Sequence, residues 1–137
     1  MTDGVESIVY KGKEVACVYR KHIPASGLLF LTPDSYPFQI GIHHRPKGTA
    51  IKAHLHNCPK PLKISEIQEF LYVVSGSIKV TMLTEKKQVI EEKTLHPGDS
   101  MLLCSLAHRV EFTKKSRIIE IKQGPYPGPA YAKNYLE

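Results

Sequence analysis

The chain has 137 residues, of which 23% are charged and 42% hydrophobic, and its formal net charge is +6 with seven histidines counted as neutral. That length suits one domain, because two separate cores would each lie near the lower limit for unaided folding. Three cysteines without a short repeated spacing exclude a disulfide scaffold. The composition therefore indicates a small, basic globular protein that is rich in histidine.

The basic residues are scattered along the chain, for example as the pairs Lys86-Lys87 and Lys114-Lys115, and form no stripe interleaved with aromatic residues. This distribution argues against a nucleic-acid interface. The longest apolar runs are far shorter than the ~18 residues of a membrane span. Residues 2–7 include two acids and lack the apolar stretch of a signal peptide. We therefore expect a cytoplasmic protein with unpaired cysteines and without nucleic-acid or membrane partners.

Hydrophobic periodicity predicts strands along almost the whole chain and no long helix. The runs are short, rich in β-branched residues and separated by glycine or proline, at the spacing of roughly 8–12 residues that is typical of antiparallel sheets. The predicted strands cover residues 15–19, 27–31, 38–44, 50–56, 70–74, 77–83, 89–95, 100–104, 108–112 and 118–122. The pattern predicts an all-β sandwich or barrel, in which residues 70–83 form a hairpin turning at Gly76 and residues 57–68 a long loop.

Histidine and glutamate side chains occur at regular places in this strand pattern. His54 and His56 stand two residues apart in the predicted strand 50–56, so both imidazoles point to the same face. Glu69 begins the next strong strand, and His108 follows a third strand. Three imidazoles and one carboxylate form a ligand set for a divalent transition metal.

The spacing of these residues resembles the two motifs of the cupin superfamily. The first motif reads Gly, five residues, His-x-His, three or four residues, Glu, six residues, Gly, and the second opens at a Gly and reaches a single His. The matching residues here are Gly48, His54, His56, Glu69 and Gly76 for the first motif, and Gly98, Asp99 and His108 for the second. The resemblance covers residues 48–112, nearly half of the chain.

The resemblance implies a single cupin-type antiparallel β-barrel, that is, a double-stranded β-helix or jelly roll. One domain would span residues 1–137, with a barrel core at about 36–123 and the N-terminal strands and an irregular C-terminal tail packed around it. It also implies that His54, His56, Glu69 and His108 bind one metal ion. The donor set suits Fe, Mn, Ni, Co, Cu or Zn and does not distinguish among them.

Some positions depart from the cupin pattern. Twelve residues separate His56 from Glu69, so residues 57–68 must loop out, and we expect this loop to rim the pocket. Gly98 is one residue closer to His108 than is usual. In the second motif Cys104 and Leu106 replace the typical Pro and Gly, and Phe112 replaces Asn. Glu66 competes with Glu69 as the carboxylate ligand, but it lies in the opposite strand phase.

Two further residues are predicted to line the pocket. Lys52 shares the phase of His54 and His56, so it would enter the barrel and bind an anionic group of the substrate; the alternative is a lysine that reaches solvent at the start of its strand. Gln123 ends the last strand and would bind a ligand at the barrel mouth, unless it is only a polar strand terminus. We expect Cys58 to be a plain loop cysteine and Cys104 a small buried one.

The apolar outer face of the predicted strand 70–74 indicates that another strand layer or a second subunit covers it. Phe70, Tyr72 and Val74 alternate with Glu69, so they project from the opposite face and need their own cover. The N-terminal strands could supply that cover, as could a second subunit. Cupins often pair through such a sheet, and the resemblance therefore implies a homodimer.

The leading functional hypothesis is a small metal-dependent enzyme of the oxygenase or isomerase type that acts on a small, anionic or sugar-linked metabolite. Sugar-modifying enzymes of this kind also work without metal, and in that case His54 or His56 would carry the proton. The alternative is a non-catalytic module that binds or senses a metal or a metabolite. A third hypothesis is a structural dimer with a vestigial site. The fold does not choose among them, because one barrel hosts many functions.

Overall fold

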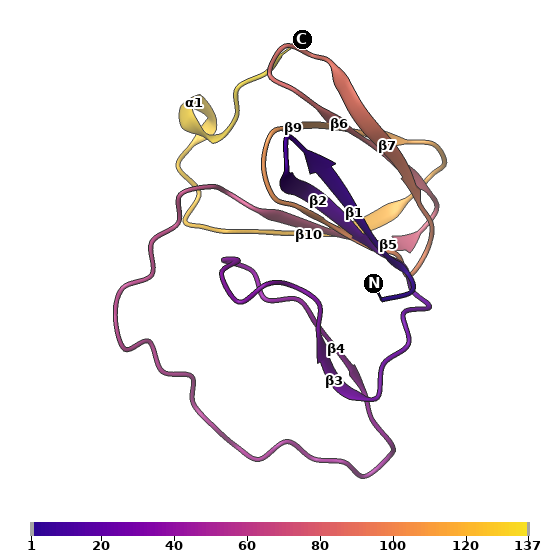
Figure 1. Ribbon diagram of the computed structural model, residues 1–137, viewed down its shortest axis with the longest axis vertical. Coiled ribbons are helices and arrows are strands. Elements are labelled where there is room, and N and C mark those ends of the chain that lie inside the picture. The colour runs from indigo at the N-terminus through magenta and orange to yellow at the C-terminus, as the bar shows by residue number, and fades with distance from the viewer. Residues whose placement is uncertain (1, 137) are drawn as a thin grey trace. The chain divides into compact units, whose positions relative to one another are not determined.

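The computed structural model describes residues 2–136, which form ten strands and one short helix (Figure 1). The elements are β1 (Val5–Tyr10), β2 (Lys13–Tyr19), β3 (Gly27–Phe30), β4 (Gly41–His44), β5 (Glu69–Ser75), β6 (Ile78–Leu83), β7 (Val89–Leu95), β8 (Ser100–Leu103), β9 (Ala107–Phe112), β10 (Arg117–Lys122) and α1 (Pro129–Ala132). The prediction of an all-β, antiparallel structure is confirmed. The chain divides into two compact units, residues 2–23 with 66–136, called here the main unit, and Pro24–Ser65, called the 24–65 unit.

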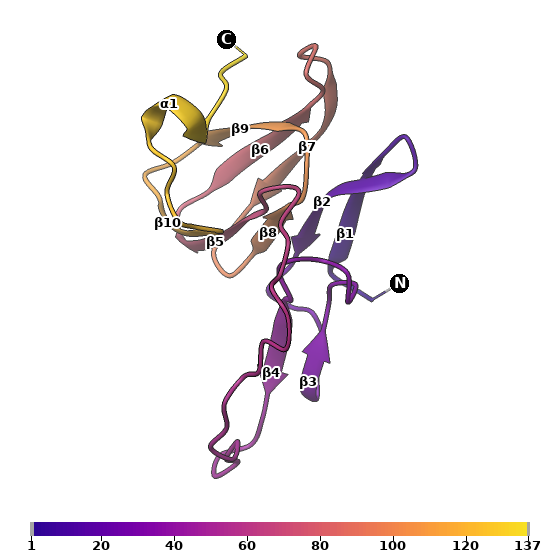
Figure 2. The same ribbon diagram turned by 90° about the vertical axis from the view of Figure 1, so that its left-hand side faces the viewer.

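The main unit consists of two antiparallel sheets. A five-stranded sheet has the order β1-β2-β8-β5-β10, and a three-stranded sheet has the order β7-β6-β9. The two sheets form separate layers (Figure 2), and apolar side chains of both layers share one core. The core residues are Ile8, Val15, Ala16, Val18, Leu71, Val73, Ile78, Val80, Met82, Leu95, Met101 and Leu103. Over residues 2–136 these sheets do not close into a barrel, so the predicted closure is not seen.

Strand β5 has one buried and one exposed face. Leu71 and Val73 are 1% and 0% exposed, whereas Tyr72 and Val74 on the other face are 39% and 41% exposed. Successive strand side chains point to opposite sides, so Glu69 lies on the buried face together with Leu71 and Val73. The sequence pattern thus predicted correctly which face of β5 turns toward the core.

The predicted hairpin at Gly76 is wrong. Strand β5 belongs to the five-stranded sheet and β6 to the three-stranded sheet, so the chain changes layers between them. Gly76 makes this crossing with a φ of 84°, and a Cβ at this position would collide with the side chain of Ser116 and the carbonyl oxygen of Lys115. Glycine is needed here for a tight passage between layers rather than for a two-residue turn.

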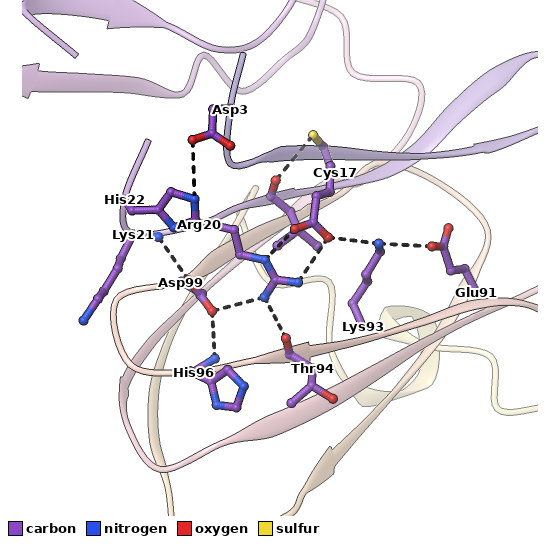
Figure 3. A network of polar contacts seen from close by, with 12 residues as sticks. Asp3, Cys17, Arg20, Lys21, His22, Glu91, Lys93, Thr94, His96 and Asp99 are labelled. Atoms are coloured by element: carbon purple, nitrogen blue, oxygen red, sulfur yellow. Dashed lines mark hydrogen bonds and ion pairs between the residues drawn. The ribbon is translucent and has the colours of Figure 1, made fainter. Parts of the chain in front are cut away.

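A network of ion pairs centred on Arg20 joins the N-terminal strands to β7 and to the turn between β7 and β8 (Figure 3). Arg20 donates from Nε and Nη2 to the carboxylate of Glu6, at 2.7 and 3.1 Å. Its Nη1 donates to the carbonyl oxygen of Thr94 at 2.7 Å and to Asp99 Oδ2 at 3.2 Å. Lys93 adds a bond to Glu6 at 2.9 Å. Only 19% of the Arg20 side chain is exposed, so the network holds sequence-distant segments together in a partly desolvated place.

The 24–65 unit contains one pair of strands and no apolar core of its own. Strands β3 and β4 are antiparallel, with Gly27 opposite His44 and Phe30 opposite Gly41. Thr32 is the one buried residue among 24–65. Large apolar side chains in this unit are exposed, for example Leu55 at 90%. Backbone pairing between β3 and β4, rather than burial of apolar side chains, therefore stabilises the 24–65 unit.

The structure corrects the expected strands at three places. Residues 50–56 are not a strand, because among residues 2–136 they have no backbone partner, and a strand exists only through pairing with a neighbour. The predicted strand 38–44 is confined to Gly41–His44. Strand β1 was not predicted and pairs with β2 at one edge of the large sheet.

The C-terminal tail is irregular apart from the single turn of α1. No helix among the described residues has the length and apolar content needed to cross a membrane. The single-domain boundaries stay a prediction.

Candidate functional site

Glu69 and His108 meet in the interior between the two sheets of the main unit. Glu69 is the first residue of β5 and lies opposite the buried Leu103 of β8. His108 lies in β9 opposite the buried Met82 of β6. Directly opposite residues of paired strands share a face, so both side chains point toward the core. Glu69 Oε2 is 3.5 Å from His108 Nε2, and their side chains are 14% and 32% exposed.

Burial changes the protonation of both groups. It is the main reason why the pKa of Glu69 rises from 4.5 to about 7, and the nearby carboxyl of Glu120 raises it further. Burial also lowers the pKa of His108, so its imidazole favours the neutral form. The pair therefore meets as a partly protonated carboxyl and a neutral imidazole rather than as a firm ion pair.

Strand β10 adds two charged side chains to the same place. In the register with β5, Lys122 lies opposite Glu69 and Glu120 lies opposite Leu71, so both lie on the same sheet face as these residues, at its exposed edge strand. The carboxyl groups of Glu69 and Glu120 are hydrogen-bonded to each other, and this bond lowers the pKa of Glu120. The charges of Lys122 and of Lys133, which directly follows α1, also act on Glu69 and His108. Glu69 and His108 are thus surrounded by three charged side chains that are themselves exposed, Glu120, Lys122 and Lys133.

His54 and His56 lie in the 24–65 unit and are both exposed. Their ring centroids are 5.0 Å apart, although the backbone around them is not a strand. His54 Nδ1 lies 2.7 Å from the carbonyl oxygen of Lys52 and donates a hydrogen bond to it. The structure brings these two imidazoles together and also brings Glu69 and His108 together, but the two pairs belong to different units.

The chemistry of Glu69 and His108 fits a divalent transition metal. A carboxylate oxygen and a neutral imidazole nitrogen face one desolvated interior, which is the donor type that such ions prefer. Among residues 2–136, however, no three histidine, cysteine, aspartate or glutamate side chains are gathered closely enough to hold a metal ion as they stand. Half of the predicted ligand set is therefore adjacent in the main unit, and the four-residue metal site stays a prediction.

The two predicted pocket residues occupy other environments. Lys52 is exposed in the 24–65 unit, so the structure shows no lysine entering a barrel at this position. Gln123 follows β10, and its Oε1 accepts a hydrogen bond from the buried backbone N–H of Gln68 at 2.7 Å. A role of Gln123 in binding a ligand stays a prediction. In their place, Lys122 and Lys133 are the cations near Glu69 and His108.

Several lesser assignments agree with the sequence. Glu66 pairs with Lys13 at 2.8 Å on the surface, away from the face of β5 that carries Glu69 toward the core. Cys58 is an exposed loop residue whose thiol contacts the carbonyl oxygen of Lys60. Cys104 is buried, as expected.

Glu120 and Lys122 were missed by the sequence analysis, although one signal was present. Both charged residues stand in alternation with Ile119 and Ile121 and share their strand phase with Ile118, which packs against the core. Alternation alone does not say which face is turned inward, because that depends on the register with β5.

Comparison of the chain with protein-family models, with curated proteins and with solved structures finds no match.

Proposed function

We propose that this protein is a metal-binding cupin, and that it is a small metal-dependent enzyme of the oxygenase or isomerase type. The observation that supports the proposal is the contact of Glu69 with His108 at 3.5 Å in a desolvated interior. The motif spacing that resembles cupins supplies the other two ligands, His54 and His56. Two facing antiparallel sheets and the crossing at Gly76 are compatible with a jelly roll.

In this proposal the chain's own residues prepare the site. His108 presents a neutral nitrogen and Glu69 a carboxylate whose charge is costly in the interior unless a cation offsets it. A divalent transition metal ion, when bound, supplies Lewis acidity or redox chemistry. Lys122 and Lys133 place positive charge beside the two ligands, which favours a small anionic substrate.

The proposal includes a cytoplasmic, homodimeric protein. None of Cys17, Cys58 and Cys104 is in a disulfide, as is typical of a reducing compartment. The outer face of β5 and β10 carries exposed apolar side chains that a second copy would cover, namely Tyr72, Val74, Ile119 and Ile121.

Metal binding tests the proposal directly. We expect the purified chain to bind one Mn²⁺, Co²⁺ or Fe²⁺ ion, and Glu69→Gln or His108→Ala to weaken binding by at least about tenfold. His54→Ala and His56→Ala should weaken it as well. His22→Ala is the matched control, because His22 is an exposed histidine of the main unit, paired with Asp3. Absence of binding by the wild type, or binding that is indifferent to both Glu69 and His108, would overturn the proposal.

Turnover assays then separate the enzyme from the binding module. The metal-loaded chain is incubated with small carboxylates, phosphates and sugar phosphates, while O₂ consumption and product isomers are followed. Reaction with one of these classes that is lost in Glu69→Gln supports an enzyme. Stoichiometric metal without turnover of any of them favours the alternative, a module that binds or senses a metal or a metabolite.

A further inference from the structure

Strand β10 forms one edge of the five-stranded sheet. It is last in the order β1-β2-β8-β5-β10, and among residues 2–136 its outer edge has no backbone partner. Residues 118–122 pair with β5 in unbroken register. The strand at the opposite edge, β1, has a register shift at its centre, between Ile8 and Val9. Irregularities of that kind turn an edge away from further pairing, so β10 is the edge that stays regular and open.

The exposed side chains of β10 combine apolar and charged groups. Ile119 and Ile121 lie on the outer face of the sheet and are 49% and 51% exposed. Glu120 and Lys122 alternate with them, and their side chains are 50% and 34% exposed. An open edge strand with exposed isoleucines pairs readily with another strand, unless charged residues of the two strands repel each other. The charges of β10 therefore decide which strand it can pair with.

Symmetry limits how two copies of β10 can pair. A homodimer has a two-fold axis, so an antiparallel pair of identical strands places one residue opposite its own copy. With Glu120 in that position, two like charges would lie directly opposite each other, which is destabilising. With Ile119 there, Glu120 and Lys122 would both lie opposite uncharged residues.

Only Ile121 in that position gives complementary charges. Glu120 then lies opposite the partner's Lys122, and Lys122 lies opposite the partner's Glu120. On the outer face Ile121 meets the partner's Ile121, and Ile119 lies diagonally beside it, within reach of a contact. One register thus pairs both charges and brings the exposed isoleucines of two strands together.

We propose that two copies of this chain join their β10 strands antiparallel, with Ile121 on the two-fold axis, so that their five-stranded sheets form one continuous sheet. The inference rests on the homodimer of the proposed function and names the strand and the register by which the copies meet. The open backbone groups of both edges gain hydrogen-bond partners in this arrangement.

A disulfide across the axis tests the register. Directly opposite residues of an antiparallel pair have Cα atoms about 4.5–5.5 Å apart, a distance that a disulfide spans. We expect Ile121→Cys to give a cross-linked dimer on mild oxidation, in a Cys58→Ser background that removes the exposed native thiol. Val9→Cys in the same background is the matched control, because Val9 is 56% exposed on the other edge strand, and it should stay monomeric on a denaturing gel.

The cross-linking result separates the register from the homodimer. A chain that is dimeric in sedimentation but in which Ile121→Cys does not cross-link would overturn the register and leave the homodimer intact. Equal cross-linking of Val9→Cys would indicate random collision and would also overturn it.

Exchange of the two charges tests their pairing. Glu120→Lys and Lys122→Glu each place like charges opposite each other at both symmetry-related positions, so each should raise the dimer dissociation constant by about tenfold or more. The two substitutions combined restore opposite charges and should give a value within about threefold of the wild type. Melting curves identify any variant that fails to fold, and the cross-link does not depend on these variants. A combined variant as weak as the single ones would overturn the pairing, whereas a monomeric wild type would overturn the proposed homodimer itself.

Discussion

Glu69 Oε2 lies 3.5 Å from His108 Nε2, although β5 and β9 belong to different sheets. The contact exists because each residue faces the interior from its own layer. Neither group gains the stability of an ordinary surface ion pair, since burial favours the uncharged form of both. Such a pair is costly for the fold, which is typical of residues that are retained for binding.

Glu69→Gln should therefore stabilise the protein in the presence of a chelator. The folded-state pKa of Glu69, about 7, lies above its ordinary value of 4.5. A group whose pKa is raised by folding contributes stability that is fully present at a pH below its pKa in the unfolded chain. This stability is lost as the pH rises through its pKa in the folded protein. The melting temperature of Glu69→Gln should exceed that of the wild type by more at about pH 8 than at about pH 5. A difference that is the same at both values would contradict this.

Glu6 should give the opposite pH dependence. Hydrogen bonds from Arg20, and then from Lys93, lower the pKa of Glu6 from 4.5 to about 2. A lowered pKa contributes stability that is complete above 4.5 and is lost as the pH falls through about 2. Urea unfolding of the wild type and of Glu6→Gln should differ most above about pH 5 and converge near pH 2. A difference in free energy of unfolding between the two proteins that is the same near pH 2 as above about pH 5 would contradict this titration of Glu6.

Arg20→Ala should destabilise the main unit by about 3 kcal/mol, because it leaves Glu6 and Asp99 without their shared cation in a partly buried place. Lys13→Ala is the control. Lys13 also pairs with a glutamate, Glu66, but its side chain is 61% exposed, so its loss should cost less than about 1 kcal/mol. Chemical denaturation measures both changes, and equal losses would refute the special role of the Arg20 network.

Gly76→Ala should be far more damaging than Gly12→Ala. Both glycines have positive φ, 84° and 77°, so alanine at either position costs about 1–2 kcal/mol of backbone strain. At Gly12 a Cβ would meet nothing within 4 Å, whereas at Gly76 it would collide with Ser116 and the Lys115 carbonyl. We expect Gly76→Ala to lose at least about 3 kcal/mol or to fail to fold. Similar stabilities of the two variants would show that the crossing at Gly76 tolerates a side chain.

Ile119→Lys should abolish the proposed homodimer. Ile119 lies opposite Tyr72 on the exposed outer face of β5 and β10, and a buried lysine there would lack a partner. Val9→Lys is the control, since Val9 is a comparably exposed apolar residue of β1. Sedimentation should give a dimer for the wild type and for Val9→Lys. A monomeric wild type would refute the dimer, and a dimeric Ile119→Lys would place the interface elsewhere.

The length, the basic composition and the alternation of apolar and polar residues were enough to predict the fold class of this protein. They located most strands of the main unit and the inward face of β5, and hence the orientation of Glu69. These features are local, because side chains two residues apart in a strand share a face whatever the rest of the chain does.

Tertiary structure decided what each strand lies beside. The sequence did not show that the chain changes sheets at Gly76, or that residues 50–56 lack a backbone partner among residues 2–136. It did not show that Glu120 meets Glu69, because a shift of one residue between β5 and β10 would turn Glu120 outward. Register and sheet order depend on the free energy of the whole fold. The sequence singled out His108 among the seven histidines, but only the tertiary structure places its imidazole beside the carboxyl group of Glu69.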